Sequence, residues 1–252
     1  MLQSKKILIA SLTIALLLIL ITSTFFSIVA AQSVNSDDVI ILIKDWEEKK
    51  IQNSQWVNII TAFTLMEPQG VILPNGEPMP SSYITDDWFY VNDAGLVEKG
   101  VFSIKDNNGN ILQQSAFQNN VLINFTFDDR QENQDFFSLN IDLGLAQQIR
   151  EASNQGLKIN KSDETVEGRP SVMYFYTEEL KLPTQLGADS VIVDSIVQKG
   201  FFDAETKDFV QLQTVWVLSD GTELVYVTVY IISIDSYSSP NDEILKILEG
   251  VK

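Results

Sequence analysis

The alternation of apolar and polar positions is clearest in residues 201–234, where three apolar runs are separated by two short polar turns. This arrangement predicts a β-meander of three sequential strands. The last run is apolar at both even and odd positions, whereas a strand with one face in water alternates apolar with polar residues. We therefore expect a second apolar layer here, made of helices, of another sheet or of a lined cavity. The apolar residues of that run are Leu224, Val225, Tyr226, Val227, Val229, Tyr230, Ile231, Ile232 and Ile234.

Other segments carry the same strand signals. The connections that follow residue 91 are short and rich in Asn, Asp and Gly, which favour tight turns between sequential antiparallel strands. The predicted strands are 56–66, 86–91, 96–105, 111–117, 121–127, 172–177 and 191–198.

Three segments have apolar residues at helical spacing, namely 37–50, 143–154 and 242–248. The residues that suit their N-terminal caps are Ser36 or Asp37, Asp142, and the Ser239-Pro240-Asn241 sequence. Residues 67–80 contain four prolines and are predicted to form a loop, either a lid over a cavity or a cover for a sheet edge. Residues 180–189 contain a proline and a glycine and are also predicted to be a loop.

The order helix, strands, helix, strands, helix predicts an α+β fold built on one large antiparallel sheet. Residues 32–252 are expected to form a single domain. Ahead of it, Lys5 and Lys6 precede an apolar run, and no further charge occurs before Asp37. Residues 1–31 are typical of a signal peptide cleaved before Gln32. The alternative is an uncleaved membrane anchor, because residues 7–31 are long enough to cross a bilayer. Either way we expect the domain to be extracytoplasmic: secreted, periplasmic or anchored facing outward.

The composition limits which partners and which catalytic groups this protein can have. The chain of 252 residues has a formal net charge of −17 and neither cysteine nor histidine. The charge disfavours nucleic acid and anionic membrane surfaces as partners. Without cysteine there are no disulfides and no lipid-modified cysteine, and without histidine Ser-His-Asp and Cys-His catalysis are excluded.

Carboxylates are the remaining catalytic candidates, so a carboxylate-based hydrolase stays as an alternative. The segment 106–110 places oxygen-bearing side chains as a calcium loop would, but its glycine comes too early, and a hairpin turn is the better interpretation. The acidic residues 128–135 are interpreted as a solvated loop. We predict no enzyme, no metal and no cofactor.

Two local patterns resemble a known superfamily. One is Val166-Glu167-Gly168 followed by an apolar strand, and the other is the sequence from Phe201 to Thr206 followed by strands around Asp220-Gly221. With a helix ahead of the first long strand, they resemble the periplasmic lipoprotein carriers and regulatory sensors of the LolA, LolB and RseB type. The resemblance implies a half-barrel, which is a strongly curved antiparallel sheet covered by a few helices. It also implies an apolar groove for acyl chains or lipoprotein peptides. The buried arginine of the carriers has no counterpart that can be matched to Arg130, Arg150 or Arg169.

The leading hypothesis is a bacterial, non-catalytic binding protein that holds a hydrophobic or lipidated ligand at the cell envelope. The alternative is an envelope domain that binds proteins, or is structural, and holds no ligand. Aromatic side chains on predicted strands could pack in the core or line a groove. The candidate groove residues are Trp88, Tyr90, Tyr174, Tyr176, Trp216, Tyr226 and Tyr230.

Overall fold

The computed structural model describes residues 31–51, 55–67, 72–139, 141–186 and 189–251. Residues 33–252 form one compact unit. The predicted signal segment therefore lies outside the described residues, except for Ala31.

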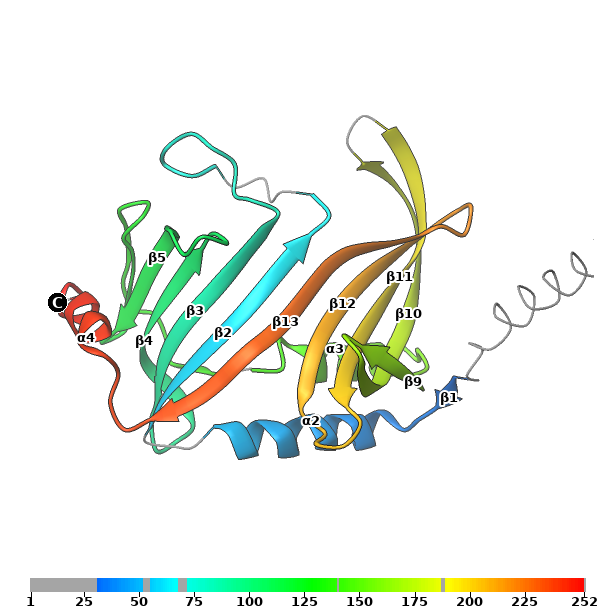
Figure 1. Ribbon diagram of the computed structural model, residues 1–252, viewed down its shortest axis with the longest axis horizontal. Helices are drawn as coiled ribbons and strands as arrows, with labels where there is room; N and C mark the ends of the chain where they lie inside the picture. Colours follow the sequence, from blue (N-terminus) through cyan, green and yellow to red (C-terminus); the bar gives the residue numbers. More distant parts are fainter. Residues whose placement is uncertain (1–30, 52–54, 68–71, 140, 187–188, 252) are drawn as a thin grey trace, which may run out of the picture. The chain divides into compact units, whose positions relative to one another are not determined.

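The described residues form a 13-stranded antiparallel sheet with three helices, which confirms the α+β half-barrel prediction (Figure 1). The sheet order is β1-β9-β10-β11-β12-β13-β2-β3-β4-β5-β6-β7, and β8 pairs with β4. The strands are β1 (Gln32–Ser33), β2 (Gln55–Leu65), β3 (Ser82–Val91), β4 (Leu96–Lys105), β5 (Ile111–Gln118), β6 (Val121–Asn124), β7 (Asp129–Gln131), β8 (Phe137–Ser138), β9 (Asn160–Val166), β10 (Arg169–Leu186), β11 (Asp189–Asp203), β12 (Phe209–Leu218) and β13 (Glu223–Tyr237). The helices are α2 (Ser36–Lys50), α3 (Leu145–Asn154) and α4 (Asp242–Glu249).

Local chemistry sets the helix ends. Asn35, rather than Ser36 or Asp37, caps α2, because its side chain accepts the backbone N–H of Asp37. Asp142 caps the start of α3 as expected, but it lies two residues ahead of the N-cap residue, Gly144. Its carboxylate accepts the N–H groups of Gly144 and Ala146, and Gly144 supplies the left-handed residue at the N-cap. Asn241 caps α4 through the N–H of Ile244.

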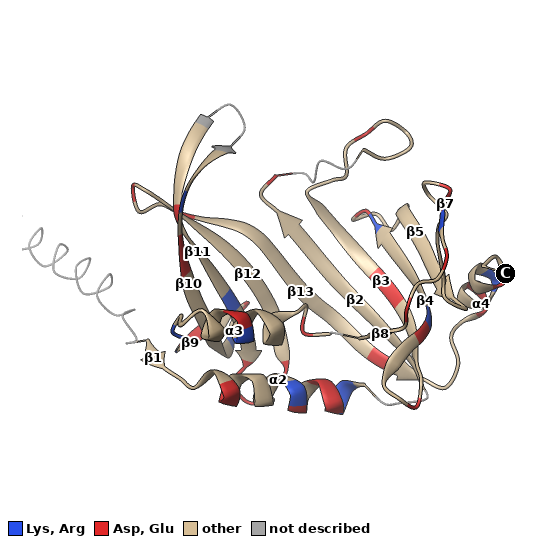
Figure 2. Cartoon of the chain, turned by 180° about the vertical axis from the view of Figure 1, so that it is seen from behind, with Lys and Arg blue, Asp and Glu red and all other residues tan. Residues whose placement is uncertain are grey.

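We call the face of the sheet that packs against α2 and α3 the inner face, and the opposite face the outer face. The inner face holds the largest cluster of buried residues. Ile43 and Trp46 of α2 and Leu145 and Ile149 of α3 pack on it. The sheet contributes Val57, Ile59, Phe89, Val91, Val97, Phe117, Tyr176, Phe202, Phe209, Leu212 and Val229. Figure 2 shows α3 lying across the β10–β12 part of the sheet, with acidic and basic residues alternating along α2. Burying this apolar surface is the main source of stability in a chain that has no disulfides.

The outer face carries α4. Ile244, Leu248 and Val251 are buried against the outer-face side chains of Trp56, Val101 and Ala116. This second cluster explains why β3 and β4 are apolar on both faces. The buried residues of α4 recur at helical spacing, which agrees with the terminal helix predicted from the sequence.

The proline-rich segment folds back onto the sheet. Leu73 and Met79 are buried with Tyr83, and they pack against the β2 residues Phe63 and Leu65. The segment was predicted to be either a lid over a cavity or a cover for a sheet edge. The described part agrees better with a cover, because its own side chains fill the space at the ends of β2–β4.

Three expectations about strands need correction. Residues 180–186 do not form the predicted loop, because β10 continues to Leu186 and pairs with β11 through a bulge between Glu179 and Leu182. Residues 187–188 of the predicted loop lie outside the described residues. The bulge places Lys181 in the left-handed region and leaves Pro183 on an edge that no other strand uses, where a missing N–H costs nothing. The polar strand β9 and the short strand β7 were not predicted from the sequence, because neither has an apolar face that would indicate a strand.

Candidate functional site

Trp216 and Tyr226 form the most prominent aromatic pair on the inner face. Their rings are stacked with centroids 3.9 Å apart and an interplanar angle of 10°. A bulge in β13 opposite Thr214 and Val215 brings Tyr226 beside Trp216, whose position on β12 has the same parity as the buried Leu212. Both rings are only half-buried. A flat aromatic surface that is partly open to solvent is suited to contact with an apolar ligand.

Tyr174 and Tyr176 also lie on the inner face, on β10. Tyr176 is buried, and burial followed by the nearby charges of Glu178 and Glu151 raises its pKa to about 12. Tyr174 is half-buried and meets Phe202 edge-on at 5.6 Å. Tyr176 is therefore part of the closed core beneath the helices, and Tyr174 packs against that core.

The other three candidates lie on the outer face. Trp88 and Tyr90 pack against the cluster under α4. Tyr230 pairs with Ala62 and Gln211, and burial raises its pKa, with a smaller effect from Glu167. The seven predicted residues are therefore divided between the two faces of the sheet, four on the inner face and three on the outer face.

A second aromatic pair on the inner face was not among the candidates predicted from the sequence. Phe63 stacks on Tyr83 with centroids 5.0 Å apart and an angle of 12°. Phe63 belongs to a predicted strand, but Tyr83 falls in β3 ahead of the predicted start at residue 86. The signal that could have found it is the alternation of Tyr83 with Phe89 and Val91 on odd positions.

The two helices of the inner face enclose a polar pocket of about 460 Å³. It is lined by Glu47 and Lys44 of α2, by Asp142, and by Arg150 and Glu151 of α3, among others. The N–H of Asp142 donates to Glu47 at 3.4 Å, and Ser36 and Ser153 hydrogen-bond between the same helices at 2.9 Å. Both oxygens of Asp142 accept N–H groups of the α3 start, so this carboxylate has a structural role.

Replacing Glu47 with glutamine is expected to stabilise the protein at alkaline pH. Burial, and then the charge of Asp142, raises the pKa of Glu47 from 4.5 to about 7. The folded state therefore holds a proton that the unfolded chain releases, and this contribution to stability is lost as pH rises from 4.5 through 7. Since Glu47 is partly exposed, we expect Glu47→Gln to raise the free energy of unfolding by only about 1 kcal/mol at pH 8. Urea denaturation at several pH values measures it, with the exposed Glu48→Gln on the same helix as control; equal pH profiles for the two variants would contradict the assignment.

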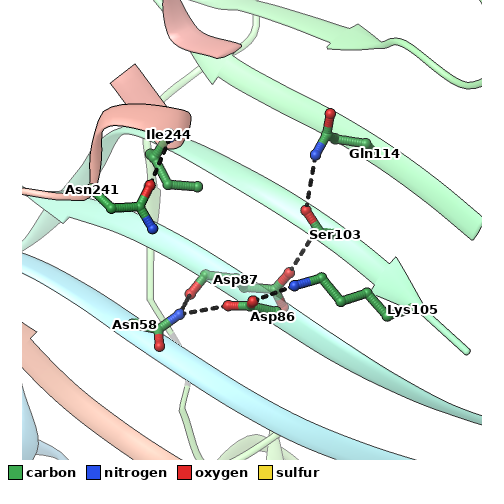
Figure 3. Close-up of polar contacts among 8 residues, drawn as sticks. All are labelled: Asn58, Asp86, Asp87, Ser103, Lys105, Gln114, Asn241 and Ile244. Atoms are coloured by element: carbon green, nitrogen blue, oxygen red, sulfur yellow. Dashed lines mark hydrogen bonds and ion pairs between the residues drawn. The ribbon is translucent and has the colours of Figure 1, made fainter. Parts of the chain in front are cut away.

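A polar network crosses β2–β5 beneath the start of α4 (Figure 3). The buried Asn58 donates to Asp86 Oδ1 at 2.8 Å, and Lys105 Nζ is 2.6 Å from Asp86 Oδ2. Asp87, the next residue, accepts the N–H of Ser103 at 3.2 Å. Successive residues of a strand point to opposite faces, so Asp86 and Asp87 are not placed to act together on one substrate. The segment 106–110 is the β4–β5 turn, in which Asp106 accepts the N–H groups of Asn108 and Asn110.

Within the described ranges, no helix combines the length and the apolarity needed to cross a membrane. In the same ranges, no three Asp or Glu side chains gather as a metal site would.

No family model matches the sequence, and no curated protein matches it. Solved structures are similar in fold. An outer-membrane lipoprotein-sorting domain from Vibrio parahaemolyticus has 8% identity and a TM-score of 0.29, over 83% of this chain and 96% of that chain. A LolA superfamily protein from Nitrosomonas europaea has 11% identity and a TM-score of 0.27, over 82% and 96%. A β-barrel-like protein from Brucella abortus has 9% identity and a TM-score of 0.22, over 75% and 100%. The second of these neighbours is named as a member of the LolA superfamily, and the TM-scores of all three are below 0.3.

Proposed function

We propose that this protein is a non-catalytic binding protein of the cell envelope, which holds a hydrophobic or lipidated ligand against the inner face of its sheet. The observation that carries the proposal is the stacked Trp216–Tyr226 pair, which is half-buried and lies on the same face as the helix-covered core. Aromatic rings that are fully enclosed serve packing alone, whereas these keep part of their surface for another molecule.

Other aromatic rings of the inner face offer less surface to a ligand. Tyr174 is half-buried, whereas Tyr176 is buried in the core. The Phe63–Tyr83 pair is covered by Leu73 and Met79 of the proline-rich segment. The acidic character of the chain disfavours an anionic membrane as the docking partner, so the ligand would be recognised mainly by its apolar part.

Two alternatives remain. A domain that binds proteins without a ligand would keep these rings as part of a protein interface. A carboxylate-based hydrolase would need two carboxylates free to face one substrate. In the pocket between α2 and α3, Asp142 is occupied in capping α3, so we favour binding over hydrolysis.

The test is native mass spectrometry, with lipid extraction, on protein purified from an envelope fraction. We expect a bound acyl lipid that is lost or reduced at least about tenfold in Trp216→Ala, because a buried aromatic contact contributes 1–3 kcal/mol to affinity. Trp88→Ala, which removes the same side chain from the outer face, is the matched control and should retain the lipid. Circular dichroism first establishes that both variants are folded. An apo mass that takes up no added fatty acid or lipopeptide would refute the proposal and favour the protein-binding alternative.

A further inference from the structure

Residues 72–80, which we call the plug, lead toward β3 at one end of the sheet (Figure 1). They fold into a small hairpin, in which Ile72 and Pro78 form an antiparallel bridge. The N–H of Leu73 donates to the carbonyl oxygen of Glu77 at 2.8 Å. In the described part of the chain, every hydrogen bond of the plug joins two of its own residues. The plug is therefore folded locally and is not tied to the sheet by hydrogen bonds.

Two apolar side chains hold the plug against the sheet. Leu73 and Met79 are 6% and 2% exposed, whereas Ile72 of the same segment is 56% exposed. The sheet residues beneath the plug are Phe63, Leu65, Tyr83, Ile104 and Leu112. A segment that has few buried contacts and no hydrogen bonds to its surroundings opens at a lower free energy than the whole fold.

The surface beneath the plug continues the inner face. The rings of Phe63 and Tyr83 are stacked, with centroids 5.0 Å apart and an angle of 12° between their planes. Phe63 also packs against the inner-face core. This surface adjoins the one proposed for the ligand, because β2 pairs with β13 and the N–H of Met66 donates to the carbonyl oxygen of Tyr226 at 2.8 Å. An apolar chain that lies on the Trp216–Tyr226 pair would thus meet the plug next.

The plug can leave this surface without unfolding. Pro74, Pro78 and Pro80 restrict its backbone. Gly76 has a φ of 85°, which suits the turn of the hairpin. These features keep the hairpin folded whether or not the sheet lies beneath it. If a hydrocarbon chain replaces the two buried side chains of the plug, a similar apolar surface of the sheet stays covered, so the exchange loses little hydrophobic stabilisation.

We propose that the plug is an autoinhibitory element, in which Leu73 and Met79 occupy a surface that also binds a hydrocarbon chain. The chain displaces the plug and lies against Phe63 and Tyr83. This role rests on the proposed function, since the hydrophobic or lipidated ligand is the same and only its contact surface is larger. The closed plug lowers the apparent affinity, because only molecules with the plug displaced offer the full surface.

A cysteine in the plug would report its displacement directly, because the chain has no cysteine of its own. In Met79→Cys the thiol is buried between the plug and the sheet, and we expect slow labelling by a maleimide. Saturating palmitate should speed the labelling about tenfold, because the bound chain shifts the plug to its displaced position. Ile72→Cys, at an exposed position of the same segment, is the matched control and should be labelled rapidly with and without palmitate.

An affinity measurement separates competition from a structural role. Leu73→Ser removes one apolar anchor, so we expect it to bind the fluorescent fatty acid cis-parinaric acid about tenfold more tightly than the unmodified protein does. A plug that only completed the ligand surface would give weaker binding instead. Ile72→Ser, the same kind of change at an exposed position, should leave the affinity unchanged. The gain in Leu73→Ser should disappear when Phe63→Ala is added, because the chain then lacks the aromatic surface that the plug had covered.

The results distinguish a failure of the plug from a failure of the proposed function. If both fatty acids bind, but the labelling of Met79→Cys does not change and Leu73→Ser binds no more tightly, the plug is a fixed cover and only the proposed function stands. If neither fatty acid binds the unmodified protein or Leu73→Ser, both are refuted. If Leu73→Ser does not fold, the labelling of Met79→Cys, which keeps an apolar side chain, decides alone.

Discussion

Replacing Phe202 with alanine is expected to lower the free energy of unfolding by about 3–5 kcal/mol. Phe202 is 0% exposed and sits at the centre of the inner-face core. The centroid of its ring lies 5.6 Å from that of Tyr174 and 5.2 Å from that of Phe209, at interplanar angles of 79° and 61°. Truncation would remove the transfer energy of the ring and leave a cavity that two flanking aromatic rings on rigid strands cannot fill. Urea denaturation followed by circular dichroism measures the change.

Two further variants make that result interpretable. Phe202→Leu keeps most of the volume and should cost less than about 1.5 kcal/mol, which provides a folded variant if alanine is not tolerated. Phe127→Ala removes the same side chain where it is 41% exposed and should change stability by less than about 0.5 kcal/mol. A small effect at Phe202, similar to that at Phe127, would mean that the inner-face core is not packed as described.

The sequence predicted the sheet better than it predicted the faces of the sheet. Strict alternation assigned the apolar residues of β13 to two faces and called for two apolar layers. Two bulges change this assignment: Val227, Val229 and Ile231 lie on the inner face, and after the second bulge so does Ile234. Of the apolar residues left on the outer face, Val225 and Ile232 are 48% and 55% exposed, and Tyr230 is half-buried. A bulge adds one residue to one strand and has no dependable signal in a single sequence.

Long strands were harder to predict than short ones. β10 runs for 18 residues, but its apolar pattern ends near Thr177, and Pro183 argues against a strand. The proline is tolerated because this end of β10 pairs only with β11 among the described strands. The edge position of the strand is a property of the assembled sheet, so local sequence could not reveal it.

The candidate site was predicted by composition more than by position. Seven aromatic residues on strands were expected to line one groove, but they lie on both faces of the sheet, because the face that each ring occupies depends on which helix covers which strand. α4 returns to the outer face and covers Trp88 and Tyr90, while α2 and α3 take the inner face. The helices were predicted, but their destinations follow from three-dimensional packing.

The second large effect is expected at Asp87, whose replacement by asparagine should stabilise the protein at alkaline pH. Asp87 faces inward and pairs across the sheet with Ile59 and Phe102. Burial in these surroundings is the main reason that its pKa is raised from 3.8 to about 7, with a smaller contribution from the charge of Asp86. Hydrogen bonds from Thr85 and from the N–H of Ser103 oppose the shift but do not cancel it.

The direction of the pH dependence follows from these two pKa values. Between pH 4 and pH 7 the folded state holds a proton on Asp87 that the unfolded chain has released, so unfolding becomes easier as pH rises through this window. The stabilising contribution of this proton is complete below the pKa of Asp87 in the unfolded chain and is lost above the pKa of Asp87 in the folded protein. Asparagine cannot ionise and keeps the shape of the side chain. We therefore expect the free energy of unfolding of Asp87→Asn to exceed that of the unmodified protein by about 2–4 kcal/mol at pH 8 and to differ little from it near pH 4.

The decisive quantity is the difference between the two unfolding free energies, measured by urea denaturation at each pH from 4 to 8. The profile of the unmodified protein alone would not suffice, because Glu47 titrates over a similar range and in the same direction. Asp86→Asn is the matched control on the adjacent position. It breaks the contact with Lys105 at 2.6 Å and should destabilise the protein at pH 8, the opposite of the effect at Asp87. A difference between Asp87→Asn and the unmodified protein that stays constant from pH 4 to pH 8 would show that Asp87 is ionised in the folded state throughout, and hence that water reaches the inner face at this point of the sheet.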